Sequence, residues 1–119
     1  MLNKLMKEIH QNAVEHGWWE DERSFGDIIA LCHSELSEAL EEHRNKRKPD
    51  EIYYSGNGYE ATSVTAVCKK PEGIPIELAD CIIRILDYCG KENIDIDTAL
   101  NIKHEYNKSR SYRHGGKVL

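Results

Sequence analysis

The segment from Ile76 to Cys89 constrains the fold more than any other part of this sequence. Apolar side chains surround most of its helical wheel, and its charged residues lie in a band of about 80° that holds Glu77, Asp80, Arg84 and Asp87. A helix that is apolar over most of its circumference is buried, so this band must face water or a bound group. Clustered buried carboxylates repel one another or become protonated, so the segment predicts a central helix whose acids need a compensating cation.

Helices are also predicted for three further segments: 2–16, 24–47 and 96–109. Apolar residues recur at three- and four-residue spacing in the first, Ser24 and Asp27 resemble a capping box at the start of the second, and Asp95 is a favourable N-cap for the third. With the central segment they predict an all-α fold, a single domain over residues 1–119 built as an antiparallel four-helix bundle.

The central helix is expected to have Pro75 in its first turn and to end before Gly90. The preceding stretch, residues 49–75, differs from the rest of the chain. Two β-prone runs, at 53–54 and 64–67, flank a turn-forming stretch that contains Gly56 and Gly58, which predicts a short β-hairpin or an irregular insert.

The charge and composition exclude several classes of protein. A formal net charge of −5 argues against a protein that grips duplex DNA, and no apolar stretch approaches the roughly 20 residues that span a bilayer. The four cysteines form no CxxC pair, and the charged N-terminal residues do not resemble a signal peptide, so neither a zinc site nor a disulfide framework is indicated. We expect a cytoplasmic protein with no membrane or nucleic-acid partner.

Two acidic pairs, Glu35 with Glu38 and Glu77 with Asp80, each place two carboxylates on one helix face. A single pair of this kind is most often a solvated surface feature. Here the first pair lies at the edge of its helix's apolar stripe, and the second lies on the narrow charged band. If the two helices pack side by side, the four carboxylates form an all-oxygen site suited to Mg²⁺ or Mn²⁺.

In their order along the chain, these pairs resemble the MazG-like all-α nucleotide pyrophosphohydrolases. Other stretches extend the resemblance over most of the chain outside 49–70: His16-Gly17-Trp18-Trp19, residues 33–42, residues 75–80 and residues 103–110. Two features depart from the pattern. Ser34 occupies a position where many relatives have a further Glu, and residues 49–75 lengthen the spacer between the two acidic pairs.

The resemblance implies Mg²⁺-dependent hydrolysis of nucleoside triphosphates, including deoxynucleotides, between the α- and β-phosphates, giving the monophosphate and pyrophosphate. Glu35, Glu77 and Asp80 are the expected metal ligands. Glu38, also able to bind the metal, is the favoured base that takes a proton from water, although the four acids could exchange roles.

The resemblance also gives basic and aromatic residues a task in holding the substrate. Lys103, Asn107 and Arg110 share one helix face, so they are candidates for phosphate binding together with Arg113 and Lys117 in the tail. Trp18 or Trp19 could stack on a nucleobase, although at least one of them is expected in the core. The full set of candidate substrate-binding residues is Trp18, Trp19, Arg84, Lys103, Asn107, Arg110, Arg113 and Lys117.

A homodimer or homotetramer is expected, because one small chain cannot cover the apolar surface of the central helix. Two alternatives to the nucleotide pyrophosphohydrolase remain open. One is a related pyrophosphatase for a phosphoribosyl-nucleotide or dUTP-type substrate. The other is a non-catalytic helical partner or regulatory protein that retains a metal-binding bundle.

Overall fold

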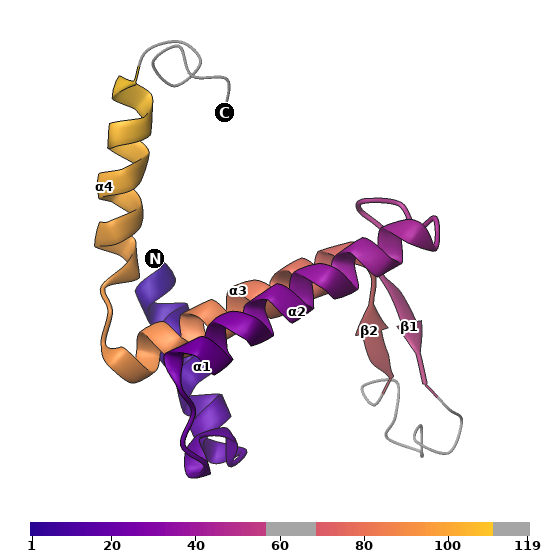
Figure 1. Ribbon diagram of the computed structural model, residues 1–119, viewed down its shortest axis with the longest axis horizontal. Coiled ribbons are helices and arrows are strands. Elements are labelled where there is room, and N and C mark those ends of the chain that lie inside the picture. Colours follow the sequence, from indigo (N-terminus) through magenta and orange to yellow (C-terminus); the bar gives the residue numbers. More distant parts are fainter. Residues whose placement is uncertain (57–68, 111–119) are drawn as a thin grey trace. The chain divides into compact units, whose positions relative to one another are not determined.

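A computed structural model describes residues 1–56 and 69–110 of the 119-residue chain. Four α-helices and a small sheet occur within these residues (Figure 1). The elements are α1 (Leu2–Glu15), the 3₁₀ helix η1 (Trp18–Glu20), α2 (Phe25–Arg44), β1 (Tyr53–Ser55), β2 (Lys70–Glu72), α3 (Ile74–Glu92) and α4 (Ile96–Ser109). The prediction of a mainly helical chain is therefore confirmed. None of the helices in the described ranges has the length and apolar character needed to cross a membrane.

The chain divides into two compact units, and α3 contributes to both of them. The described part of unit 1 comprises residues 1–20 and 86–110, and unit 2 comprises residues 21–85. The core of unit 1 is a cluster of Met6 on α1 with Leu86 and Cys89 on α3. The core of unit 2 lies along α2 and the first half of α3, where the buried apolar residues are Ile28, Cys32, Ala39 and Cys81.

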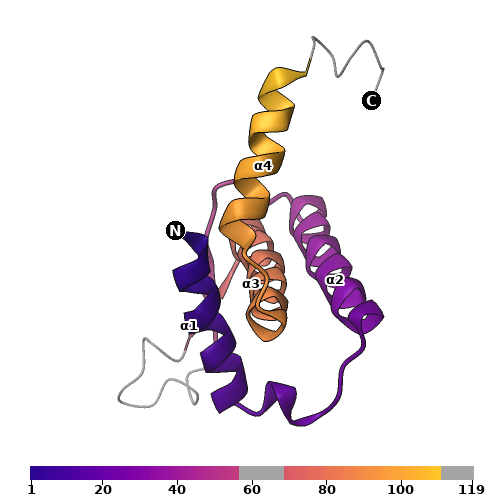
Figure 2. The same ribbon diagram turned by 90° about the vertical axis from the view of Figure 1, so that its left-hand side faces the viewer.

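In unit 1, α1 and α4 cap each other's N-termini (Figure 2). The Asp97 carboxylate accepts hydrogen bonds from the backbone N–H of Leu2 at 2.8 Å and of Asn3 at 3.1 Å. In return, the Asn3 side-chain oxygen accepts the N–H of Ile96 at 3.1 Å. Each exchange satisfies backbone donors that a helix leaves unpaired at its start. Asp95 is the N-cap of α4, as predicted, and accepts the Thr98 N–H at 3.0 Å.

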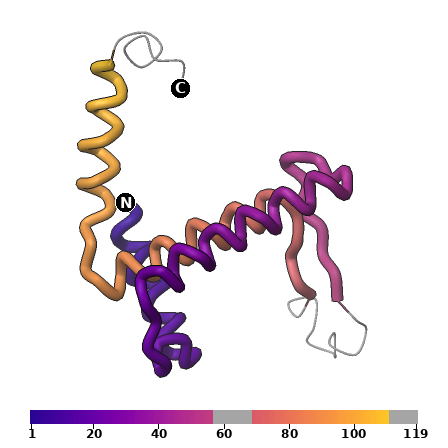
Figure 3. The backbone as a smooth tube through the Cα atoms, in the orientation of Figure 1, coloured from indigo at the N-terminus to yellow at the C-terminus, as the bar shows by residue number. Residues whose placement is uncertain are grey.

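In unit 2, α2 and the first half of α3 run antiparallel and side by side (Figure 3). The predicted capping box opens α2: the Ser24 hydroxyl accepts the Asp27 N–H, and the Asp27 carboxylate accepts the Ser24 N–H. The helix ends at Arg44, three residues before the predicted end. Lys46 adopts a left-handed φ of 65°, and the Arg47 N–H bonds back to the Glu42 carbonyl, which closes the last turn.

The predicted end of α3 before Gly90 is wrong. Pro75 lies in the first turn as expected, but the helix continues through Gly90 to Glu92 and stops where Asn93 has a φ of 55°. Within unit 1, a Cβ on Gly90 would lie 2.5 Å from the Cβ of His10 on α1. The glycine therefore permits the close approach of two helices instead of terminating one.

The hairpin strand that pairs with β1 also differs from the prediction. Tyr53 lies opposite Glu72, and Ser55 lies opposite Lys70, in an antiparallel register. The sequence favoured the run at 64–67 as the partner of β1, but that run lies outside the described residues. Pro71 is compatible with β2 because both strands of a two-stranded sheet are edge strands, where a missing N–H is tolerated.

Candidate functional site

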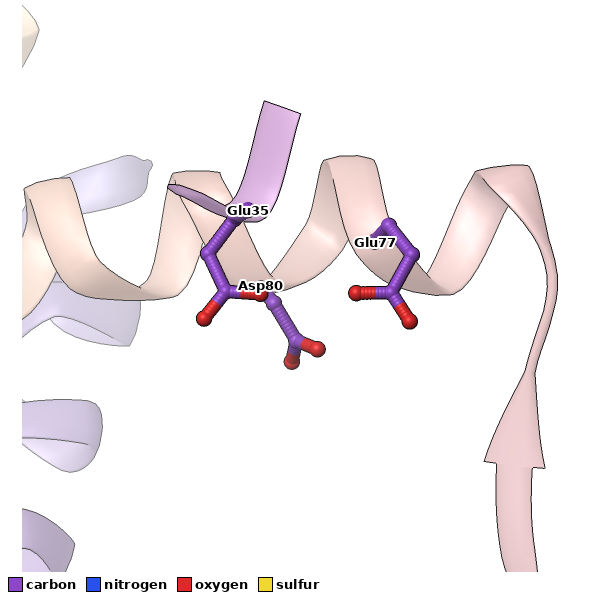
Figure 4. Close-up of side chains that lie close together, drawn as sticks. All are labelled: Glu35, Glu77 and Asp80. Atoms are coloured by element: carbon purple, nitrogen blue, oxygen red, sulfur yellow. The ribbon is translucent and has the colours of Figure 1, made fainter. Parts of the chain in front are cut away.

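Three carboxylates from two helices of unit 2 converge on one point (Figure 4). Glu35 comes from α2, and Glu77 and Asp80 come from successive turns of α3. One oxygen from each residue lies within 4.8 Å of the other two. Glu77 and Asp80 share a face because they are three residues apart, and antiparallel packing brings Glu35 to that face. The structure thus brings together three of the four predicted metal ligands.

Arg84 places a positive charge beside this cluster. Its Nε donates a hydrogen bond of 2.8 Å to Glu35 Oε1, a partner that the helical wheel did not predict. Burial opposes ionisation of Glu35, but the bond from Arg84, with support from Glu38 and Glu77, holds the pKa of Glu35 below its usual value. Glu35 is therefore an ionised acid, and Arg84 fixes its orientation.

The surroundings of Glu77 oppose its ionisation, in contrast to those of Glu35. The Glu77 side chain is buried, with 9% exposed, and among the described residues its Oε2 is a buried side-chain atom with no hydrogen-bond partner. Burial, followed by the proximity of Glu38, Asp80 and Glu35, raises the pKa of Glu77 to about 7. An unpartnered buried carboxylate oxygen is costly to leave unsatisfied, so this atom is the natural ligand position in the cluster.

The cluster forms part of a cavity of about 410 Å³ within unit 2, a size that accommodates a small organic ligand. Burial and the charge of Glu35 raise the pKa of Asp80, while Arg84 and Lys70 act in the other direction. Seven carboxylates and one ammonium group line the cavity among the described residues, and they belong to Glu35, Glu38, Glu41, Glu42, Lys70, Glu72, Glu77 and Asp80.

Glu38, the predicted base, lines this cavity but is exposed and lies outside the set of three convergent acids. It is therefore accessible to a water molecule inside the cavity. Sequence reasoning missed Lys70 and Glu72, which β2 contributes to the lining. No spacing rule could have found them, because their position depends on the pairing of β2 with β1 across the insert.

The predicted aromatic residues lie in unit 1, whereas every lining residue of the cavity belongs to unit 2. Trp19 is half-buried, and its Nε1 donates a hydrogen bond of 2.9 Å to Asp87. Its ring meets His10 edge-on, and the Lys91 ammonium lies 5.2 Å from the ring centroid. Trp19 therefore has structural contacts within its own unit, which fits the core role expected for one of the pair. Trp18 is also half-buried.

The predicted phosphate-binding residues of α4 are also in unit 1. Lys103 and Asn107 are exposed on α4, and Arg110 follows its last turn. Lys103 Nζ and the Arg110 guanidinium lie 4.9 Å and 5.6 Å from the centre of the Tyr106 ring, so both flank an exposed aromatic side chain. The remaining candidates, Arg113 and Lys117, lie outside the described residues.

The donor set fits a hard divalent cation. All three convergent groups are carboxylates, and oxygen ligands of this kind suit Mg²⁺ or Mn²⁺ over softer metals. Glu77 Oε2 provides an unsatisfied buried oxygen at the same place. Burial and mutual repulsion raise the pKa values of Glu77 and Asp80, and such a cation would offset the repulsion.

No protein-family model, curated protein or solved structure matches the chain.

Proposed function

We propose that the protein is a divalent-cation-dependent nucleoside triphosphate pyrophosphohydrolase with a MazG-like helical arrangement. The observation that carries the proposal is the convergence of Glu35, Glu77 and Asp80, with the unpartnered Oε2 of Glu77 buried among them. The ordered acidic motifs on α2 and α3, which resemble those of MazG-like enzymes, support the choice of a polyphosphate substrate.

In this proposal Glu35, Glu77 and Asp80 hold Mg²⁺. When bound, such an ion neutralises phosphate oxygens and makes water a better nucleophile. Arg84 keeps the Glu35 carboxylate in place through the 2.8 Å hydrogen bond. Glu38, exposed to the cavity, orients the attacking water and accepts its proton at a carboxylate oxygen. Attack at the α-phosphorus breaks the α–β anhydride bond and releases pyrophosphate.

The direct test incubates the full chain with Mg²⁺ and a panel of ribo- and deoxyribonucleoside triphosphates. The proposal predicts monophosphate and pyrophosphate in equal amounts for at least one nucleotide, and no product when EDTA is added. Orthophosphate release, or no turnover of any member of the panel, would contradict it. Cation binding without turnover would favour the non-catalytic metal-binding protein.

The role of Glu38 has its own test. Glu38→Gln should reduce kcat at least tenfold, about 1.4 kcal/mol of barrier, while Mn²⁺ binding persists because the three convergent acids remain. Asp50→Asn is the matched control, since Asp50 is an exposed acid of unit 2 outside the cavity lining. If Glu38→Gln retains wild-type kcat, the base is another of the four acids.

We also propose that the protein self-associates through α2 and α3. Each helix has an exposed apolar stripe that follows its buried band by about 80° around the helix axis. The two helices are antiparallel (Figure 1), so an offset in the same rotational sense turns both stripes to one side of the pair, and the helical wheels place the acids on the other side. The face consists of Phe25, Ile29, Leu36 and Leu40 on α2 with Leu78, Ile82 and Ile85 on α3.

A second copy of the chain is the occupant that we assign to this face. The chain has a formal net charge of −5, and its acid-lined cavity would repel a second copy, whereas the stripe residues carry no charge. Leu36→Glu should convert a dimer or tetramer to monomers in sedimentation equilibrium. Ile102→Glu on α4 is the control, because Ile102 is more exposed, at 67% against 47%. A wild-type monomer, or dissociation by Ile102→Glu alone, would contradict this surface.

A further inference from the structure

One wall of the cavity comes from the β-hairpin and has a different character from the helical walls. The helices contribute six carboxylates to the lining, whereas β2 contributes Lys70 and Glu72. Lys70 is the single basic residue in the lining among residues 1–56 and 69–110. Lys70 lines the same cavity as Glu35, Glu77 and Asp80, the three convergent acids.

The hairpin is attached to α2 at its base. Tyr53 on β1 donates its hydroxyl to the Glu42 carboxylate, with both oxygens at 2.8 Å. The Arg47 guanidinium lies 3.6 Å from the centre of the Tyr53 ring and bonds Glu51 at 2.9 Å. These contacts hold β1 at the C-terminal end of α2, and the register of β1 with β2 then fixes Lys70 opposite Ser55.

Close packing at the C-terminal end of β2 also restricts the strand. Gly73, directly after β2, has a φ of 125°, and a Cβ there would overlap the carbonyl oxygen of Glu51. Only glycine fits this position without strain. The strand that carries Lys70 is therefore held at both β1 and the start of α3, and its lysine is placed at the cavity by the fold.

A lysine among seven carboxylates weakens cation binding, because its charge repels a divalent ion held in the same cavity. A polyphosphate brought in with the cation reverses this effect, since the ammonium can then bond a phosphate oxygen. We propose that β2 is the phosphate-facing wall of the cavity and that Lys70 binds an oxygen of a cation-bound polyphosphate chain. The inference builds on the proposed function and assigns the insert a part in substrate binding.

The test uses two ligands whose affinities should change in opposite directions. Lys70→Met removes the charge and keeps an unbranched side chain at an exposed position, so the fold should persist. Mn²⁺ alone should bind the variant about twofold to fivefold more tightly in calorimetry, because a nearby positive charge is lost. Inorganic tripolyphosphate in saturating Mg²⁺ should bind at least tenfold more weakly.

Lys69→Met is the matched control. Lys69 is the adjacent exposed residue, lies just before β2 and is not part of the cavity lining. Both affinities should change less than twofold in this variant. Unchanged tripolyphosphate binding by Lys70→Met, or an equal loss in Lys69→Met, would overturn the inference.

The outcomes separate this inference from the proposed activity. Tripolyphosphate binding that depends on Lys70, in a protein that releases no pyrophosphate from any nucleotide, would support the phosphate-facing wall and contradict the hydrolase. Pyrophosphate release with wild-type KM in Lys70→Met would support the hydrolase and contradict the wall.

Discussion

Glu77 and Asp87 lie on the same helix, α3, and are almost equally buried, with 9% and 7% of their surfaces exposed. Their surroundings nevertheless differ. In unit 1, Asp87 Oδ1 receives the Trp19 Nε1–H at 2.9 Å and meets His10 Nδ1 at 2.8 Å. In unit 2, Glu77 lies near other acids, and its Oε2 has no hydrogen-bond partner among the described residues.

Burial alone therefore does not identify a functional acid. A buried carboxylate with internal donors is a structural element, because the protein itself supplies the compensating interactions. A buried carboxylate that faces other carboxylates lacks this compensation and requires something from outside the chain. The helical wheel of α3 places both acids on one charged band, so the sequence pattern alone cannot separate the two roles.

The largest expected effect is a loss of catalysis when an acid of the convergent cluster is replaced. Glu35→Gln or Asp80→Asn should reduce Mg²⁺-dependent turnover to less than a tenth of wild type, more than about 1.4 kcal/mol of barrier, because each removes a cation ligand. Asp87→Asn should retain most of the turnover at a temperature where it is folded. Pyrophosphate release measures the rates, and far-UV circular dichroism checks that helicity is preserved. Turnover above a tenth in either ligand variant would show that the cluster is not the site.

The next largest effect should be on the stability of the metal-free protein. Substitutions of Glu77 and Asp87 should change the free energy of unfolding in opposite directions. Asp87→Asn should lower the free energy of unfolding by about 1–3 kcal/mol, because it weakens the hydrogen bonds of a buried carboxylate to two half-buried partners, His10 and Trp19. Glu77→Gln should raise it by about 1–2 kcal/mol at pH 8, because it removes an uncompensated buried charge. Urea denaturation in EDTA measures both changes. A loss of stability in Glu77→Gln comparable to that in Asp87→Asn would remove the distinction.

The stability difference between Glu77→Gln and the wild type should depend on pH. The pKa of Glu77 is raised to about 7 in the folded protein from an ordinary value of 4.5, so between these values the folded state holds a proton that the unfolded state has released. The stability from this group is thus complete below pH 4.5 and is lost as the pH rises through 7. The gain from Glu77→Gln should be absent near pH 4 and complete near pH 8. A gain that is independent of pH would contradict this origin.

The smallest effect should come from Asp95, a carboxylate whose donors are all at the protein surface. Hydrogen bonds from Asn3, and then from the Thr98 backbone and side chain, lower the pKa of Asp95 to about 2. Its contribution should be complete above pH 3.8 and be lost as the pH falls towards 2, opposite in direction to that of Glu77. The difference in melting temperature between wild type and Asp95→Asn should shrink over that range. A constant difference would exclude the charge as its source.

Features determined by local chemistry were predictable from the sequence. The capping box of Ser24 and Asp27 and the N-cap Asp95 both occur where a few neighbouring residues indicated them. The convergence of Glu35 with Glu77 and Asp80 followed from helical periodicity, given side-by-side packing.

Features that depend on contacts between distant segments were not predictable in this way. Gly90 is a helix terminator by local rules, but the approach of His10 from α1 gives it a place inside α3. Lys70 reaches the cavity only through the pairing of β2 with β1, which the β-prone run at 64–67 obscured. The pairing of Arg84 with Glu35 likewise depends on how two helices meet.

Calorimetric titration of the metal-free protein with Mn²⁺ at pH 8 would show whether Glu77 is a cation ligand. We predict saturable binding by the wild type, binding at least tenfold weaker by Glu77→Gln, and wild-type affinity in Asp87→Asn. This pattern would link cation binding to the unpartnered buried acid and not to buried acids in general. Absence of binding by the wild type, or equal weakening in the two variants, would contradict the claim.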